Sequence, residues 1–502
     1  MAVNEEQIDE FAEVFRRFLE RMARPGGEGP SLAERLAEHL GVDPIGLSAI
    51  SEGFEPWEHA NVQAALDAYL AQPGHDAQLV GVLGGQKRGF GVGLSDLLVT
   101  RALSVAGMPS GGSRSGPVDY VNVAAGPGRS LVCIQFGVVL ITSPDDKLAV
   151  LIRTADERSG PMGAKVTIEV MAPEPELATA FLAGFRTLMV EHNVYRGQVV
   201  SLARRQGPYG TMVVEFHPRP EVGRDDIVLA DGVLDRIDAH VVGIGAERVR
   251  LLDAGRHLKR GLLLHGPPGT GKTLTVRYLA HRMADATVLI LSGPALALVG
   301  PTCALARTLT PAVVVLEDVD LVAEERTMPG GGRNPLLFEL LNEMEGMAED
   351  ADVAFLLTTN RPDILEPALA ARPGRIDLAV EIGLPDAEGR RLLELYGVGL
   401  DLRLDDAEAI IDRTEGVSPA FIKELLRKAS LVAARDTPEG DLVVTDVHVN
   451  AALDELLAET GSLTRLLLGG ATDRPPPTTR ASMGWLPGAT EPVTTGTVQR
   501  RG

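Results

Sequence analysis

An eight-residue segment has the residue types and spacing of a phosphate-binding loop: Gly266-Pro267-Pro268-Gly269-Thr270-Gly271-Lys272-Thr273. Its glycines permit backbone conformations that turn successive N–H groups inward, and the N-terminus of a following helix adds positive potential. Lys272 has the length to reach the β and γ phosphates, Thr273 offers a hydroxyl to Mg²⁺, and Leu274 completes the candidate binding set. The segment therefore predicts a site for a nucleotide and Mg²⁺.

The sequence around the loop supplies the strand and helix that such a loop needs. The apolar run 261–265 precedes it, and residues 274–280 continue with helical spacing. Further apolar runs are separated by segments long enough for helices; they are 287–291, 313–316, 353–357 and 378–382. This alternation predicts an α/β fold with a parallel sheet flanked by helices, and a ligand beyond the carboxyl ends of the strands.

Two acidic residues, Glu317 and Asp318, come directly after the third of the five predicted strands. An acid pair after a strand is often surface decoration. Here, however, the acid pair follows a strand of the same predicted sheet as the phosphate loop. This position would place the two carboxylates beside the phosphates, where Mg²⁺ is held and a water is polarised. We assign Mg²⁺ to Glu317, with Thr273, and water polarisation to Asp318, although Asp318 can share or exchange the metal role.

Composition limits the classes of partner and compartment. The 502 residues include 48 Lys and Arg against 69 Asp and Glu, a formal charge of −21, so no global electrostatic footprint for nucleic acid or anionic membrane exists. The start is acidic, and no apolar run approaches the ~20 residues that span a bilayer. Cys133 and Cys303 lie in apolar surroundings and are expected to be buried free thiols. These features predict a cytoplasmic protein without a membrane segment.

The residues before the loop predict two further units. Helical spacing at 5–23, a capping box at Ser31 and Glu34, and a helix over 58–71 make residues 1–75 a helical N-terminal module. Residues 76–220, with a Gly/Ser linker near 107–116, alternate strand-like runs with one helix over 176–192 and predict an α+β domain. This domain shows no catalytic or metal-binding spacing, so we interpret it as a recognition or regulatory domain.

At this point the chain resembles the remodelling branch of the AAA ATPases, a branch of the AAA+ P-loop proteins, over roughly residues 225–460. The segment 357–363 is similar to the first sensor of that family, which implies that Asn360 orients the attacking water. The segment 371–377 is similar to the arginine-finger segment, which implies that Arg372 and Arg375 reach the γ-phosphate of a neighbouring subunit. The resemblance thus implies ATP as the substrate, a homo-oligomeric ring, commonly a hexamer, and a protein partner.

The same resemblance implies a nucleotide-binding domain over 225–386 and a small helical lid over 387–460. Ser418 and Ala420 fit the small residues that replace the second-sensor arginine in this branch. Beyond the lid, the composition of residues 461–502 predicts a disordered tail.

Three features depart from the family pattern. The acids run Glu317 then Asp318, whereas the family order is Asp then Glu; the order here is similar to that of the mitochondrial branch that translocates a folded Rieske protein. Family members that thread a polypeptide through a central pore present an aromatic residue on a pore loop. The matching segment here, Leu298-Val299-Gly300, has a leucine at that position, which weakens the expectation that this chain threads polypeptide. Ala371 makes the segment that leads to Arg372 one residue longer than in the family pattern. Which of Arg372 and Arg375 is the main arginine finger is therefore left open.

Two hypotheses of different class follow. The first is Mg²⁺-dependent ATP hydrolysis, coupled by a ring to the remodelling of a protein partner held by the N-terminal residues. The second is a nucleotide-gated binding or scaffold protein with slow hydrolysis. A nucleic-acid motor is disfavoured by the charge. The sequence names neither the partner nor the subunit number.

Overall fold

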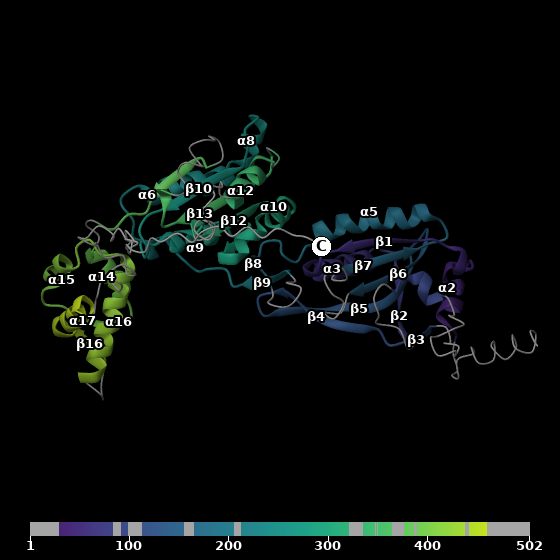
Figure 1. Ribbon diagram of the computed structural model, residues 1–502, viewed down its shortest axis with the longest axis horizontal. Helices are drawn as coiled ribbons and strands as arrows, with labels where there is room; N and C mark the ends of the chain where they lie inside the picture. The colour runs from purple at the N-terminus through teal and green to yellow at the C-terminus, as the bar shows by residue number, and fades with distance from the viewer. Residues whose placement is uncertain are drawn as a thin grey trace, which may run out of the picture.

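The structure is a computed structural model (Figure 1). It describes residues 30–83, 92–98, 113–154, 165–204, 212–320, 335–346, 348, 350–363, 376–385, 389–436 and 441–458. The helix expected over 5–23, the tail expected over 461–502, and both Arg372 and Arg375 lie outside these residues. Between them, the described segments form two large sheets and a helical C-terminal unit (Figure 1).

The first sheet is antiparallel and has the strand order β1-β7-β6-β5-β2-β3, with β4 paired to β5. Helices cover both of its faces. Its strands are β1 (Ala49–Phe54), β2 (Asp76–Leu83), β3 (Arg114–Gly116), β4 (Asp119–Gly126), β5 (Arg129–Thr142), β6 (Lys147–Thr154) and β7 (Val166–Met171). Its helices are α2 (Leu32–Leu40), α3 (His59–Leu70), α4 (Leu94–Leu98) and α5 (Pro175–Glu191).

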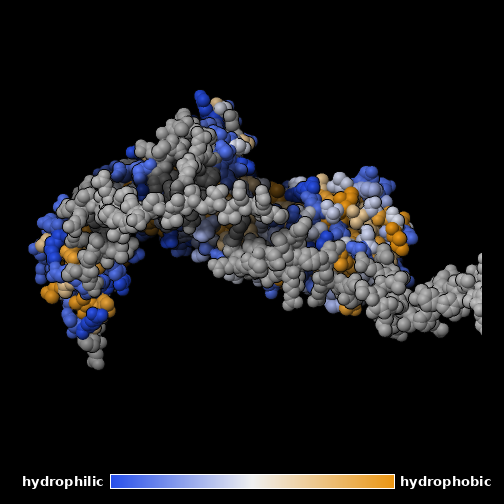
Figure 2. Space-filling model, viewed as in Figure 1, coloured by the Kyte–Doolittle hydropathy of each residue, from blue (hydrophilic) through white to orange (hydrophobic). Residues whose placement is uncertain are grey.

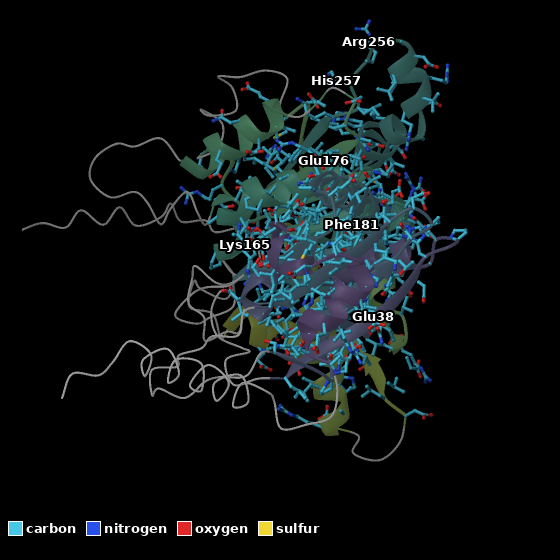
Figure 3. The ribbon with its side chains drawn as sticks, turned by 90° about the vertical axis from the view of Figure 1, so that its right-hand side faces the viewer. Glu38, Lys165, Glu176, Phe181, Arg256 and His257 are labelled. Atoms are coloured by element: carbon cyan, nitrogen blue, oxygen red, sulfur yellow. The ribbon has the colours of Figure 1, made fainter. Side chains whose placement is uncertain are left out.

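Each face of this sheet has its own core. On one face α3 and α5 pack against strand residues; there Phe181, labelled in Figure 3, lies against Phe185 at a ring-centroid distance of 5.5 Å. On the other face α2 and α4 bury leucines at three- and four-residue spacing. The expected capping box of α2 is present, because the Ser31 hydroxyl accepts from the Glu34 N–H and the Glu34 side chain accepts from the Ser31 N–H.

Residues 1–75 do not form a separate helical module, so that expectation is wrong for the described part. Strand β1 pairs antiparallel with β7 across all six of its residues, from Ala49 with Met171 to Phe54 with Val166. The short run 49–54 was missed because it holds few apolar residues and pairs with a strand more than a hundred positions away. The expected linker also differs at its end, since Arg114–Gly116 forms β3.

The second sheet has the order β14-β10-β13-β12-β11-β8-β9. Its first five strands are parallel, in agreement with the expected α/β fold. They are β10 (Arg260–His265), β11 (Thr287–Ser292), β12 (Ala312–Glu317), β13 (Val353–Thr359) and β14 (Leu378–Glu381). The surrounding helical elements are α6 (Val233–Asp238), the π-helix η5 (Ala239–Gly243), α7 (Ile244–Ala246), α8 (Arg248–Asp253), α9 (Lys272–Arg282), η6 (Gly293–Leu298), α10 (Val299–Thr308) and α12 (Pro335–Glu345).

Two strands extend this sheet from the preceding part of the chain. Strand β8 (Val199–Arg204) pairs parallel with β11, and β9 (Met212–His217) pairs antiparallel with β8. The expected boundary near residue 220 is therefore wrong, because residues 199–217 belong to the sheet of the nucleotide module. Sequence alone assigned these strands to their chain neighbours rather than to a strand almost ninety residues later.

The segment 192–198 joins α5 to β8, and three of its residues, 194–196, contact both parts of the structure. The Tyr195 hydroxyl donates to the Trp57 carbonyl, and the Tyr195 ring lies 5.6 Å from that of Phe216 in β9. The Val194 N–H donates to Asn61 Oδ1 over 2.9 Å. Arg196 donates to the carbonyls of Val190, Thr308 and Thr310, at the ends of α5 and α10.

The C-terminal unit is helical and has its own core. It comprises α14 (Gly389–Gly397), α15 (Ala407–Arg413), α16 (Pro419–Asp436), α17 (Asp446–Ala458) and the small parallel pair β15 (Asp401–Arg403) and β16 (Val443–Thr445). These helices lie within residues 387–460, where the family resemblance implies a small helical lid. Figure 2 shows hydrophobic colour on this unit, and its exposed apolar residues include Val398, Leu442 and Val447.

Both cysteines are buried free thiols, as expected. Burial raises the pKa of each thiol to about 12, so neither is a nucleophile near neutral pH. Across the described residues, no helix combines the length and apolarity needed to cross a bilayer.

Candidate nucleotide-binding site

The phosphate-binding loop follows β10, which lies between β13 and β14. Gly266, Gly269 and Gly271 have φ values of 141°, 76° and 107°, a region that residues with a Cβ rarely adopt. A Cβ on Gly266 would lie 2.3 Å from the Ile382 carbonyl oxygen. Glycine is therefore required at this turn for both conformation and space.

Lys272 is the first residue of α9 and is only 6% exposed. Its Nζ donates to the carbonyls of Gly266 and Pro267 over 2.9 and 2.7 Å, so the ammonium lies against the loop. Burial lowers the pKa of Lys272, and the charges of Asp318 and Asp320 partly offset that effect. A cation held among loop carbonyls and carboxylates suits an incoming triphosphate.

Glu317 is the last residue of β12, and its carboxylate lies beside the Thr273 hydroxyl. Burial raises the pKa of Glu317, as does the Asp318 charge, while Thr273 and Arg277 act in the opposite direction. A hydroxyl and a carboxylate side by side are the oxygen donors that Mg²⁺ prefers. These residues fit Mg²⁺, and the assignment of the metal to Thr273 and Glu317 stays a prediction.

Asp318 has a φ of 50°, the one positive value recorded for a non-glycine residue in the described chain. Its Oδ1 lies 3.4 Å from Asn360 Nδ2, a long contact in which the amide donates. Burial and the Asp320 charge raise the pKa of Asp318, whereas Lys272 and Asn360 lower it. The structure thus brings together Asp318 and Asn360, the two residues predicted to act on the attacking water, just beyond the ends of the neighbouring strands β12 and β13.

Asp320 belongs to the same cluster, and the sequence analysis did not single it out. It is 5% exposed, and its Oδ1 accepts from the Thr359 hydroxyl over 2.7 Å and from the Asn360 N–H over 3.2 Å. A third acid two positions after Asp318 was the available signal. It was missed because an acid beyond a strand end is usually solvated.

A pocket of about 680 Å³ adjoins the loop on the side of β14. Its walls combine the segment before α6, the phosphate loop, the segment after β14 and the start of α16. The lining residues include Val228, Asp231, Pro267, Thr270, Ile382 and Pro419. A cavity with both apolar and polar walls that opens beside phosphate-binding N–H groups suits a nucleotide base.

The helical unit contacts the loop directly through α16. The Ala420 N–H donates to the Gly269 carbonyl over 3.2 Å. A Cβ on Gly269 would lie 2.9 Å from both Ala420 Cβ and Ser418 Oγ. Small residues at 418 and 420 are therefore required for this approach, and α16 lies where it can register the state of the loop.

The segment Leu298-Val299-Gly300 lies at the junction of η6 and α10. Leu298 is 6% exposed and Val299 is fully buried. These two side chains therefore pack into the core.

Comparison with known proteins places these features in a family. The family model described as "ATPase family associated with various cellular activities (AAA)" matches residues 262–384. The proteasome-activating nucleotidase of Thermococcus onnurineus is 31% identical over 282 residues, which cover 53% of this chain and 69% of that protein. The chain belongs to the AAA ATPase family.

Other relatives agree with this placement. The proteasome-activating nucleotidase of Methanococcus maripaludis is 31% identical over 255 residues, 48% of this chain and 62% of that protein. The ATP-dependent zinc metalloprotease FtsH of Staphylococcus haemolyticus is 36% identical over 229 residues, 42% of this chain and 31% of its own length. This AAA ATPase thus spans about three fifths of the length of the Methanococcus maripaludis nucleotidase and under a third of the length of the Staphylococcus haemolyticus protease.

Proposed function

We propose that this AAA ATPase hydrolyses ATP with Mg²⁺ and couples hydrolysis to the remodelling of a protein partner. The observation that carries the proposal is the meeting of the loop, the acid pair and Asn360 at one edge of the sheet. When bound, Mg²⁺ would neutralise phosphate charge beside Thr273 and Glu317. Asp318 and Asn360 then hold and orient the attacking water.

Ring formation is part of the proposal. The resemblance assigns Arg372 and Arg375 to the neighbouring subunit's γ-phosphate, where a planar guanidinium neutralises developing charge. Exposed apolar residues on the helical unit support a contact with a second copy; Val398 is 81% exposed and Val447 is 72% exposed. A homo-oligomer, commonly a hexamer in this family, would complete each active site.

The N-terminal part is the proposed place for a protein partner. Relatives named as a proteasome-activating nucleotidase and an ATP-dependent protease support action on proteins. The described residues before 191 form a covered sheet that residues 194–196 tie to the ATPase sheet. Partner binding on that sheet would therefore be linked mechanically to the nucleotide site.

A nucleotide-gated scaffold with slow hydrolysis is the second candidate. It is favoured by the burial of Leu298 and Val299, since side chains inside the core offer no grip on an extended polypeptide. We therefore do not include threading in the proposed remodelling. The two candidates differ in whether ATP turnover, or only ATP binding, drives the assembly.

Steady-state ATP hydrolysis by the full chain and by Asp318→Asn, with mass by light scattering, separates the candidates. Turnover of roughly 0.1 to 10 s⁻¹ in a ring-sized assembly, lost in the variant, supports the ATPase. Arg375→Ala provides a second test, because a finger acting across subunits would be needed for turnover but not for nucleotide binding. ATP-dependent assembly with no turnover above that of Asp318→Asn would leave only the scaffold.

A further inference from the structure

The paired backbone of β12 and β13 ends before the catalytic residues begin. The last register pair joins Leu316 to Leu357. Asp318 and Asn360 lie beyond it, so the regular sheet ladder does not fix their separation. Because water orientation requires both side chains at set positions, other contacts must hold the two strand ends together.

Four hydrogen bonds tie these ends beyond the ladder. Thr358 accepts two of them: its Oγ1 from the Asp318 N–H over 3.0 Å, and its carbonyl from the Val319 N–H over 3.1 Å. Asp320 accepts the other two through Oδ1, from the Thr359 hydroxyl and the Asn360 N–H. The Thr359 hydroxyl itself accepts from the Arg361 N–H over 2.9 Å.

The Asp320 contacts reach the backbone of the residue that handles the water. A buried carboxylate that accepts from an N–H and a hydroxyl makes charge-assisted bonds, which are stronger than neutral ones. These bonds restrain Asn360 from the β12 side, while Thr358 restrains Asp318 from the β13 side. The strand ends are thus fixed reciprocally.

We propose that Asp320 is a positioning residue for hydrolysis, which holds Asn360 in register with Asp318 through its bonds to Thr359 and the Asn360 N–H. The inference rests on the proposed ATPase function. The hydrogen bonds of Asp320 go to Thr359 and the Asn360 N–H, and it acts on Lys272 of the loop through its charge alone. Its loss should therefore act mainly on the rate of the chemical step and much less on nucleotide binding. A displacement of ~1 Å at a catalytic group costs on the order of a hundredfold in rate.

The test compares kcat and nucleotide affinity in the full chain with Asp320→Ala, Asp320→Asn, Thr359→Val and Thr359→Ser. Asp320→Ala is expected to lower kcat by about 10- to 100-fold, with the Kd for a fluorescent ATP analogue changed less than about threefold. Asp320→Asn retains an accepting oxygen and should keep more of the activity. Thr359→Ser retains the hydroxyl and should stay near wild type, whereas Thr359→Val, of similar size, should lose activity.

Comparing Thr359→Val with Thr359→Ser separates the loss of this hydrogen bond from a loss of folding. Valine and serine both fit the site, but only serine can donate to Asp320. A double variant, Asp320→Ala with Thr359→Val, should lose less activity than the two single losses combined, since both changes remove the same bond between the Thr359 hydroxyl and Asp320. Unchanged kcat in Asp320→Ala, or affinity that falls in parallel with kcat, would overturn the proposal. A wild type without turnover would instead overturn the ATPase function, and this role with it.

Discussion

The amide nitrogen of Asn360 lies 3.4 Å from Oδ1 of Asp318, although the two residues are separated by 42 positions in the chain. The parallel pairing of β12 and β13 creates this proximity. A carboxylate that accepts and an amide that donates can together hold one water in a fixed orientation, which is the requirement for in-line attack on a phosphoryl group.

Asp318→Asn should abolish most turnover, leave nucleotide binding close to wild type, and keep or slightly raise stability near neutral pH because the ionised Asp318 is unfavourably buried. Asparagine keeps the shape of the side chain and tolerates a left-handed backbone, so the fold has no reason to change. It cannot act as a base, and a loss of at least about a hundredfold in kcat is expected. Thermal unfolding and nucleotide titration provide the matched controls; an active Asp318→Asn would remove Asp318 from the mechanism.

Asp318→Glu should fail to improve the enzyme even though it restores an acid of the family's usual type at this position. The positive φ of 50° favours Asp or Asn over Glu, and the change should cost up to about 1 kcal/mol of unfolding free energy. The longer side chain also moves the carboxylate relative to Asn360, so kcat should fall about tenfold or more. Urea unfolding and steady-state kinetics test both parts; faster turnover would show that the shorter acid limits the rate.

The acid pair should make stability and activity depend on pH in opposite directions. Burial raises the pKa values of Glu317 and Asp318, and so do the charges of Asp318 on Glu317 and of Asp320 on Asp318. The folded chain therefore binds these protons more tightly than the unfolded chain. Their contribution to the free energy of unfolding is therefore present at low pH and lost as pH rises from about 4 through the raised pKa values.

Glu317→Gln isolates the stability effect, because glutamine keeps the shape and stays neutral. Without nucleotide, the unfolding free energy of Glu317→Gln relative to wild type should increase as pH rises from about 4 towards neutrality. Turnover by the wild type should instead fall on acidification, since the reaction needs ionised carboxylates. A stability difference that does not vary with pH would contradict the raised pKa of Glu317.

The buried ion pair of Arg260 and Asp352 should be important for stability. Arg260 is 1% exposed and donates to Asp352 over 2.8 Å, to the Val241 carbonyl over 2.7 Å and to the Leu258 carbonyl over 2.8 Å. Asp352→Ala leaves a buried guanidinium without its carboxylate and should cost about 3–5 kcal/mol. Asp401→Ala, which breaks an exposed pair with Arg403, should cost less than about 1 kcal/mol in the same unfolding measurement.

Arg196 should couple the N-terminal sheet to the ATPase sheet without affecting basal hydrolysis. Its guanidinium joins carbonyls at the ends of α5 and α10, where the helix dipoles favour a cation. Arg196→Ala should raise amide hydrogen exchange over residues 188–198 while basal kcat stays within about twofold. Arg196→Lys, which retains the charge but not the fork of donors, should show an intermediate effect. Unchanged exchange in both variants would refute the coupling.

The sequence predicted the site more completely than it predicted the domain boundaries. The proximity of the loop, Glu317 and Asp318 was predictable because each follows a continuous apolar strand, and the carboxyl ends of parallel strands share one edge. Asn360 came from the family resemblance, and the roles of all these residues stay predictions. Asp320 was not predicted, since its role depends on the Thr359 hydroxyl of a neighbouring strand. Strands β1, β8 and β9 were misplaced because their pairing partners are distant in sequence.

Strand β9 is the last strand of the ATPase sheet, and β4 and η2 (Pro56–Glu58) lie against it. An uncovered strand of this kind offers a row of unpaired backbone groups on which further chains can add. Elements of the N-terminal part therefore cover this edge of the ATPase sheet, in addition to being the proposed place for a protein partner. A fragment that starts at β10 lacks β8 and β9, so β11 becomes the exposed edge strand. A fragment that starts at β8 keeps both strands but leaves β9 uncovered. Both fragments should aggregate through these strand edges more readily than the full chain.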